Sequence, residues 1–151
     1  MKSRKVMIVA GEASGDLHGG NLVRAMHRLD PDLSFYGVGG REMKGAGVEL
    51  MADAADMAVV GLSEVIRKLW TILGVMHRLK QSLAQASPDL AILIDYPDFN
   101  LPLARAARKR GIKVLYYISP QVWAWRKGRI KTIRNSVDRM AVILPFEEAF
   151  Y

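Results

Sequence analysis

The sequence predicts an α/β protein built on an open, mostly parallel sheet of about six strands with helices on both faces. Short apolar runs alternate with segments of helical periodicity along the whole chain, as they do in a series of βαβ units. The length of 151 residues suits one domain with its own core. Half of the residues are hydrophobic, which excludes a disordered chain. We therefore expect a single domain over residues 1–151.

The expected elements follow in chain order, starting with a buried strand over Lys5–Ala10. Gly11–Gly15 is expected to be a loop, and Asp16 suits the N-cap of a helix over Leu17–Leu29, which Pro31 follows. The rest of this half is expected to form a strand at Ser34–Val38, a turn at Gly39–Gly40, a short helix at Arg41–Ala46 and a weaker strand at Val48–Met51.

The longest helix is expected over Gly61–Ala86, and its apolar surface is unusually wide. One stripe, which a helix packed on a sheet would bury, consists of Val65, Leu69, Ile72, Met76, Leu79 and Leu83. A second row lies on the adjacent flank and consists of Leu62, Ile66, Trp70 and Leu73. This row either packs against other protein or forms an exposed patch that contacts membrane or acyl chains.

An apolar strand is expected over Leu90–Ile94, followed by a helix over Leu101–Arg110. Pro102 is tolerated only in the first turn of that helix, which makes Asn100 a better N-cap than Asp98. The remaining elements are a strand at Lys113–Ile118, a basic helix at Arg126–Ser136, a strand at Arg139–Leu144 and a helix that begins at Pro145.

Asp95 stands directly after the buried strand over Leu90–Ile94, with a second carboxylate three residues later at Asp98. Ligands of open parallel sheets collect at the carboxyl ends of the strands. Asp95 is therefore where a catalytic group is expected, although α/β proteins also have residues without a function at such positions.

Two more segments follow expected strands. Gly11–Asp16 leads into a helix N-terminus, where backbone N–H groups can hold an anion or a sugar, but it also fits a simple tight turn. Ser119–Arg126 contains two tryptophans and an arginine, which suit a sugar ring, a base or a phosphate. The tryptophans equally suit packing of the loop. Gly11–Asp16 has neither the spacing of a Walker A loop nor that of a dinucleotide-binding loop.

Basic residues are concentrated in the last third of the chain. Eleven lysines and arginines lie between Arg105 and Arg139 against Asp138 alone, so this segment carries +10 and the rest −3 of the net +7. Such a segment favours an anionic neighbour, which could be phospholipid, a phosphorylated substrate or nucleic acid. A solvated helix face explains the charge equally well.

Several classes of site are disfavoured by the sequence. The chain has no cysteine, which rules out disulfides and thiolate metal sites, and its three histidines are not spaced as metal ligands. We expect no metal and no cofactor. The basic start at Met1–Lys5 leads into only a short apolar run, so we expect no signal peptide. No apolar run reaches the length of a spanning helix.

Six motifs, taken together and in order, resemble the lipid-A-disaccharide synthase family. They are Val9–Asp16, Val38–Gly40, Val60–Gly61, Ile94–Asn100, Tyr117–Arg126 and Leu144–Glu147. The resemblance implies an inverting glycosyltransferase of the two-domain GT-B type, built from Rossmann-like domains. Such an enzyme joins UDP-activated diacylglucosamine to diacylglucosamine 1-phosphate and releases UDP at the cytoplasmic face of the Gram-negative inner membrane.

The resemblance also implies that the chain is the N-terminal, acceptor-side half of a longer protein. The C-terminal donor domain, which holds most of the UDP site, would be absent, and we expect no turnover by this half alone. Asp95 would be the general base for the acceptor 6-hydroxyl, with Asp98 and Asn100 holding Asp95 or the acceptor. Other residues that would line the cleft are Gly11, Glu12, Ser14, Gly15, Asp16, Ser119, Gln121, Trp125 and Arg126. Those that would enter the lipid of an anionic membrane are Leu62, Ile66, Trp70 and Leu73.

Two other classes of function remain open on the residues alone. The strand, loop and helix at the start of the chain are compatible with a stand-alone nucleotide- or flavin-binding module. The basic segment is compatible with a nucleic-acid-binding domain, but its aromatic residues do not interleave with the charges as stacking platforms would. We therefore expect no nucleic acid partner.

Overall fold

The computed structural model describes residues 2–58, 62–120 and 128–151. Within these residues it contains a sheet of six strands, which are β1 (Lys5–Ala10), β2 (Ser34–Gly39), β3 (Val48–Asp53), β4 (Leu90–Ile94), β5 (Lys113–Tyr117) and β6 (Arg139–Ala141). Neighbouring strands all pair in parallel, in the order β3-β2-β1-β4-β5-β6. The open parallel sheet predicted from the alternating sequence pattern is therefore confirmed.

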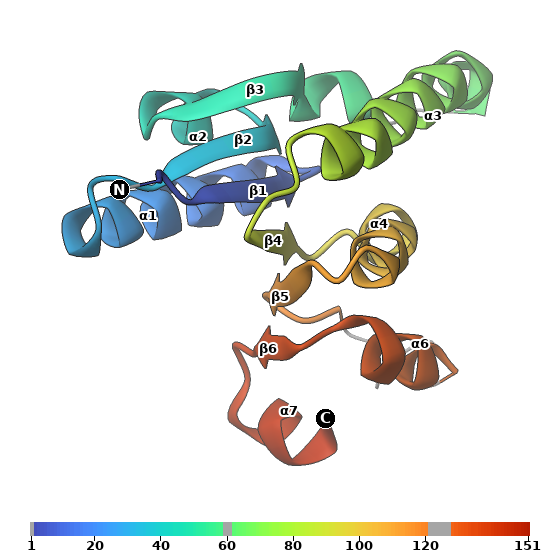
Figure 1. Ribbon diagram of the computed structural model, residues 1–151. Helices are drawn as coiled ribbons and strands as arrows, with labels where there is room; N and C mark the ends of the chain where they lie inside the picture. The colour runs from blue at the N-terminus through green and yellow to red at the C-terminus, as the bar shows by residue number, and fades with distance from the viewer. Residues whose placement is uncertain (1, 59–61, 121–127) are drawn as a thin grey trace.

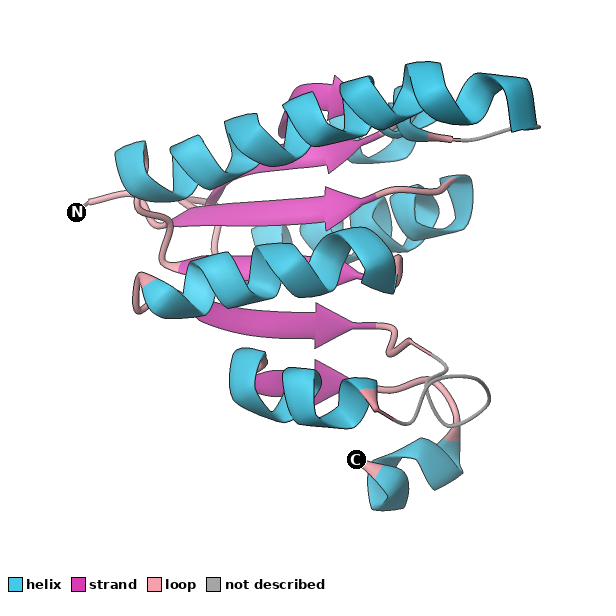
Figure 2. Ribbon diagram, turned by 90° about the vertical axis from the view of Figure 1, so that its right-hand side faces the viewer, coloured by secondary structure: helices cyan, strands magenta, loops and turns pink. Residues whose placement is uncertain are grey.

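Helices cover both faces of the sheet (Figure 1, Figure 2). On one face lie α1 (Ala13–Leu29) and α2 (Arg41–Gly45), and on the other lie α3 (Leu62–Gln85), α4 (Pro97–Lys109) and α6 (Arg129–Ser136). The last helix, α7 (Pro145–Phe150), begins at Pro145 as predicted. Each face has its own hydrophobic core, one that includes Val23 of α1 and another that includes Leu79 of α3. Because both faces are covered, the central strands are apolar throughout.

α1 begins earlier than predicted, and Asp16 is not its N-cap. The helix starts at Ala13 with Glu12 in the N-cap position, so Gly11 and Glu12 alone form the turn after β1. The Asp16 carboxylate instead accepts hydrogen bonds from the first turn of α2. Its donors are the backbone N–H groups of Gly40 at 2.7 Å, Glu42 at 3.0 Å and Met43 at 3.0 Å. Asp16 therefore caps a different helix from its own, because α1 and α2 pack side by side.

α4 also begins earlier than predicted, at Pro97 rather than Leu101. Tyr96 occupies the N-cap position, so the assignment of the N-cap to Asn100 is wrong. Pro97 has the φ that the first helical position requires, and Pro102 lies inside the helix without an N–H to donate. The helix tolerates this loss because the apolar residues of the same turns are buried against the sheet.

α3 projects beyond the sheet, so only part of the predicted stripe is buried. Leu79 and Leu83 are buried together with Val75, which the prediction omitted. Val65 and Leu69 are 42% and 49% exposed, and the expectation that the sheet covers them is wrong. The reason is length: a helix of 24 residues is about 36 Å long. The five residues of β4 span only about 17 Å.

Other boundaries differ from the prediction by a few residues. β3 continues to Asp53 and leads into a 3₁₀ turn, η1 (Ala54–Met57), that was not predicted. β5 and β6 end at Tyr117 and Ala141, which is earlier than predicted. The predicted start of the basic helix at Arg126 lies outside the described residues. These shifts leave the order and type of the elements unchanged.

Candidate active site at the carboxyl edge of the sheet

The order in which the strands are added to the sheet changes direction at the boundary between β1 and β4. The first three strands succeed one another toward one edge and the last three toward the other, with β1 and β4 paired at the centre. Ala10 and Ile94 are register partners. The residues that follow them, Gly11 and Asp95, therefore emerge side by side at the carboxyl edge. This is the topological switch point, where open α/β sheets bind ligands.

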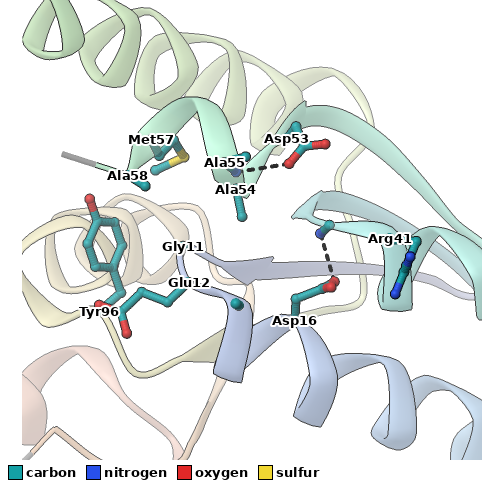
Figure 3. Close-up of a pocket in the computed structure, with 12 residues that line it drawn as sticks. Gly11, Glu12, Asp16, Arg41, Asp53, Ala54, Ala55, Met57, Ala58 and Tyr96 are labelled. Carbon is teal, nitrogen blue, oxygen red and sulfur yellow. Dashed lines mark hydrogen bonds between the residues drawn. The ribbon is translucent and has the colours of Figure 1, made fainter. Parts of the chain in front are cut away.

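A cavity of about 800 Å³ opens at this edge (Figure 3). Its walls come from the turn after β1, the start of α2, η1 and the turn after β4. The described residues that line it are Gly11, Glu12, Ala13, Asp16, Gly40, Arg41, Asp53, Ala54, Ala55, Met57, Ala58 and Tyr96. Most are small or apolar, with carboxylates, a guanidinium and a phenol among them. This mixture suits a polar ligand of sugar size.

Asp95 and Tyr96 both have left-handed backbone conformations, with φ of +45° and +47°. Such a conformation costs a residue other than glycine about 1 to 3 kcal/mol, so the surrounding structure has to fix it. The Asp95 carbonyl oxygen accepts hydrogen bonds from Asn100 Nδ2 at 2.8 Å and from the Tyr116 hydroxyl. Both donor residues are fully buried. The backbone that carries Asp95 is therefore held from below by two core side chains.

The Asp95 carboxyl lies in an environment that favours its protonated form. Burial, and then the negative charge of Glu12, raise its pKa above the ordinary value, while a backbone hydrogen bond from Tyr96 lowers it in part. A carboxylate with a raised pKa is a stronger base than an ordinary one. Asp95 does not itself line the cavity but adjoins it through Tyr96. The arrangement can accept a proton from a ligand that reaches the Asp95 side of the cavity.

Tyr96 forms the aromatic part of the cavity wall, and sequence reasoning did not select it. Its ring stacks on Phe99, with ring centroids 5.8 Å apart. It also lies against Gly11, where a Cβ atom would come within 2.4 Å of the ring. Burial, Glu12 and Asp98 raise the pKa of Tyr96, so its phenol is neutral at physiological pH. The available signal was an aromatic residue directly after a strand-terminal carboxylate.

Asp98 and Asn100, the two predicted supports of Asp95, occupy different environments. Asn100 is fully buried and donates hydrogen bonds to the carbonyl oxygens of Ile94, at 3.1 Å, and of Asp95. Asp98 forms an ion pair with Arg129 at the start of α6, and its side chain is 79% exposed. Asn100 thus contacts the Asp95 backbone, whereas Asp98 joins α4 to α6.

The remaining predicted cleft residues are dispersed around this edge. Gly11, Glu12 and Asp16 line the cavity, whereas Ser14 is exposed on α1 and Gly15 is buried. Ser119 is buried directly after Ile118, beyond the end of β5. Three predicted residues lie outside the described part of the chain, namely Gln121, Trp125 and Arg126.

The projecting half of α3 exposes large apolar side chains. Ile66, Trp70 and Leu73 of the predicted second row are 71%, 73% and 51% exposed, while the side chain of Leu62 is not described. We name the exposed side chains of Val65, Ile66, Leu69, Trp70 and Leu73 the α3 apolar surface. No helix in the described parts of the chain is both long and apolar enough to cross a membrane.

The family model and the curated sequences that this chain matches indicate one family. The family model described as lipid-A-disaccharide synthetase matches residues 6–151. The curated lipid-A-disaccharide synthase of Syntrophus aciditrophicus (strain SB) is 70% identical over 151 residues, which are 100% of this chain and 39% of the relative. The chain thus spans about two fifths of the length of the curated relatives it matches.

Two solved structures share the fold at low sequence identity. A putative UDP-N-acetylglucosamine 2-epimerase from Listeria monocytogenes has a TM-score of 0.61 and 11% identity, over 94% of this chain and 40% of that one. MurG from Acinetobacter baumannii has a TM-score of 0.59 and 14% identity, over 95% of this chain and 41% of that one. These two structures therefore share the open α/β fold of this chain, and the expected Rossmann-like architecture is confirmed as a fold.

Proposed function

This chain belongs to the lipid-A-disaccharide synthetase family, and from that premise we propose that it is the acceptor-binding part of a glycosyltransferase. The whole protein would transfer 2,3-diacylglucosamine from its UDP derivative to 2,3-diacylglucosamine 1-phosphate, forming the lipid A disaccharide and UDP. One observation carries the proposal. A half-buried carboxylate of raised pKa, Asp95, stands at the switch point beside a cavity of about 800 Å³.

In this proposal Asp95 is the general base of a single displacement. Its carboxylate takes the proton from the acceptor 6-hydroxyl as that oxygen attacks the anomeric carbon of the donor sugar. The bond between that carbon and the UDP oxygen breaks, and its electron pair leaves with UDP. One attack inverts the anomeric centre, so one base suffices. The raised pKa of Asp95 improves its match to the proton it accepts.

The other groups at the switch point would position the acceptor. The Tyr96 ring offers an apolar face on which a sugar ring can pack. Glu12 adds to the effect of burial in raising the pKa of Asp95, and it can accept hydrogen bonds from sugar hydroxyls. Asn100 and Tyr116 would act indirectly, by holding the strained backbone on which Asp95 is carried. The UDP site would come from the part of the protein outside this chain.

The α3 apolar surface would place the protein on the cytoplasmic face of the inner membrane, where the acylated substrates lie. Its apolar side chains can enter the acyl region, and the neighbouring exposed Arg67 can contact anionic head groups. Association of this kind is peripheral and leaves the acceptor partly in the bilayer. It accounts for a row of exposed apolar residues that the sheet does not need.

The test uses a chimera in which this chain replaces the matching region of the Syntrophus aciditrophicus relative. Disaccharide formation is measured with the UDP-sugar donor and the diacylglucosamine 1-phosphate acceptor. Asp95→Asn should lower kcat by roughly a hundredfold to ten-thousandfold, the range expected when a general base is lost.

Asp98→Asn is the matched control because it removes a carboxylate three residues away. Asp98 is exposed and contributes an ion pair, so this variant should retain most of the turnover. The base is misassigned if Asp98→Asn abolishes turnover while Asp95→Asn retains it. A folded, membrane-associated chimera that forms no disaccharide would reject the proposed function.

A further inference from the structure

Arg41 is the one guanidinium among the described residues that line the cavity. It is the first residue of α2, and its side chain is exposed. Within the described parts of the chain, no carboxylate lies at ion-pair distance from it. The next residue, Glu42, is by contrast paired with Arg24 at 3.3 Å. The Arg41 charge is therefore available to a ligand.

Three backbone N–H groups at the start of α2 are already used within the protein. The Asp16 carboxylate already accepts hydrogen bonds from the N–H groups of Gly40, Glu42 and Met43. These donors are occupied by the buried Asp16 carboxylate. An anion that enters this side of the cavity therefore meets the Arg41 guanidinium as the one such group among the described lining residues.

Figure 3 shows Glu12 and Tyr96 on one side of the cavity and Arg41 on the other. The proposed acceptor sugar needs two separate binding groups. Its 6-hydroxyl and its phosphate leave the ring from different carbons, so an acceptor that presents the hydroxyl to Asp95 needs a separate group for the phosphate. We infer that Arg41 binds the phosphate of the acceptor sugar, an inference that rests on the proposed function.

Two carboxylates of the cavity are already hydrogen-bonded by backbone donors. The Asp16 carboxylate accepts three backbone N–H groups, and Asp53 Oδ1 accepts a hydrogen bond from the Ala55 N–H at 2.9 Å. Glu12 lies on the Tyr96 side of the cavity, away from Arg41 (Figure 3), and its charge acts on Asp95. Carboxylates suit the hydroxyl groups of a sugar, and a guanidinium suits two oxygens of a phosphate at once.

The test compares two acceptors in the chimera, diacylglucosamine 1-phosphate and diacylglucosamine without the phosphate. Arg41→Gln should raise KM for the phosphorylated acceptor by roughly ten- to a hundredfold, the value of a charge-assisted hydrogen bond. It should leave KM for the unphosphorylated acceptor unchanged. Lys44→Gln, which removes an exposed α2 charge outside the cavity lining, is the control and should affect neither.

The outcomes separate this inference from the proposed function. If the unsubstituted chimera forms disaccharide but Arg41→Gln leaves KM unchanged, or raises it equally for both acceptors, Arg41 does not bind the phosphate. If the unsubstituted chimera forms none, the proposed function fails first. A second measurement does not need turnover: glucosamine 1-phosphate is titrated into this chain and followed by NMR. Arg41→Gln should weaken the binding of glucosamine 1-phosphate. An equal affinity of the unsubstituted chain and of the variant for this ligand would overturn the inference.

Discussion

Among the described residues at the carboxyl edge, three have positive φ without being glycine: Asp95 at +45°, Tyr96 at +47° and Ile118 at +64°. Such conformations persist only where the surrounding structure fixes them, and they cluster at functional sites. Here the fixing groups are visible at Asp95, whose carbonyl oxygen accepts two hydrogen bonds from buried side chains. The strain and the raised pKa of Asp95 thus fall on the same residue. Both are consistent with a site kept for chemistry rather than for stability.

The charge of Asp95 should make the protein less stable at neutral pH. Its pKa in the folded protein lies above the ordinary value of 3.8, so the folded state binds this proton more tightly than the unfolded state does. The resulting stabilisation is complete below the ordinary pKa and is lost as the pH rises through the raised pKa. Asp95→Asn should therefore raise the Tm near pH 7, and by less near about pH 4. Thermal unfolding of this chain at both pH values measures the difference.

The same raised pKa predicts the acid side of the activity profile. The proposed base acts only when deprotonated, so kcat/KM of the chimera should fall at a higher pH than it would with an ordinary carboxylate. A lower Tm for Asp95→Asn near neutral pH would contradict the assignment of an unfavourable buried charge. A fall of kcat/KM only at or below the ordinary carboxyl pKa would contradict a raised pKa of Asp95 in the active protein.

At the scale of elements, Asp16 shows how α1 and α2 depend on each other. Asp16 is 7% exposed, and its carboxylate accepts hydrogen bonds from three backbone N–H groups at the start of α2, a helix of only five residues. So short a helix is not stable on its own. The capping carboxylate therefore fixes the position of α2, and with it the wall of the cavity that carries Arg41.

Asp16→Ala should destabilise this chain by about 2 to 4 kcal/mol, because it leaves several donors near the core unpaired. Urea unfolding monitored by circular dichroism measures the change. Asp53→Ala is a matched control, since Asp53 is exposed and caps η1 through one backbone N–H at 2.9 Å. It should cost about 1 kcal/mol or less. Equal losses in the two variants would show that Asp16 does not have the proposed capping role.

The α3 apolar surface makes a prediction about membrane binding. The double substitution Ile66→Gln/Trp70→Gln removes two side chains that are 71% and 73% exposed, so it should not unfold the chain. It should weaken binding to vesicles that contain anionic phospholipid by at least roughly tenfold, because two large apolar groups can no longer enter the bilayer. Co-sedimentation with the vesicles measures this.

Leu29→Gln is the control for that experiment. Leu29 is 88% exposed but lies at the far end of α1, away from the α3 apolar surface. This variant should bind vesicles as the unsubstituted chain does. Unchanged binding by the double variant would assign the α3 apolar surface to another partner, and stronger binding to DNA than to vesicles at the same salt concentration would favour the nucleic-acid alternative.

At the scale of the whole molecule, the order of the elements could be predicted because local pattern determines it. The apolar run over Leu90–Ile94, for example, fits a strand buried on both faces, and it forms the central strand β4. The starts of α1 and α4 could not be predicted, because distant groups decide them. Asp16 caps a helix 24 residues away, and the Pro102 turn is held by the core. The same holds for the site. The position of Asp95 at the end of a strand could be predicted from the sequence. The place of Tyr96 in the cavity wall could not, because it depends on the contact of its ring with Gly11.

Whether this chain can act alone depends on how a leaving diphosphate would be stabilised. A diphosphate leaving group needs cationic or dipolar stabilisation, and the described lining of the cavity offers one guanidinium, Arg41, which we assign to the acceptor. The chain also spans only 39% of its Syntrophus aciditrophicus relative. We therefore expect no disaccharide from this chain with both substrates, and full turnover from the chimera. Mass spectrometry of the lipid products measures both. Disaccharide formed by the chain alone would mean that the switch point holds donor and acceptor together, and it would remove the reason to place the UDP site elsewhere.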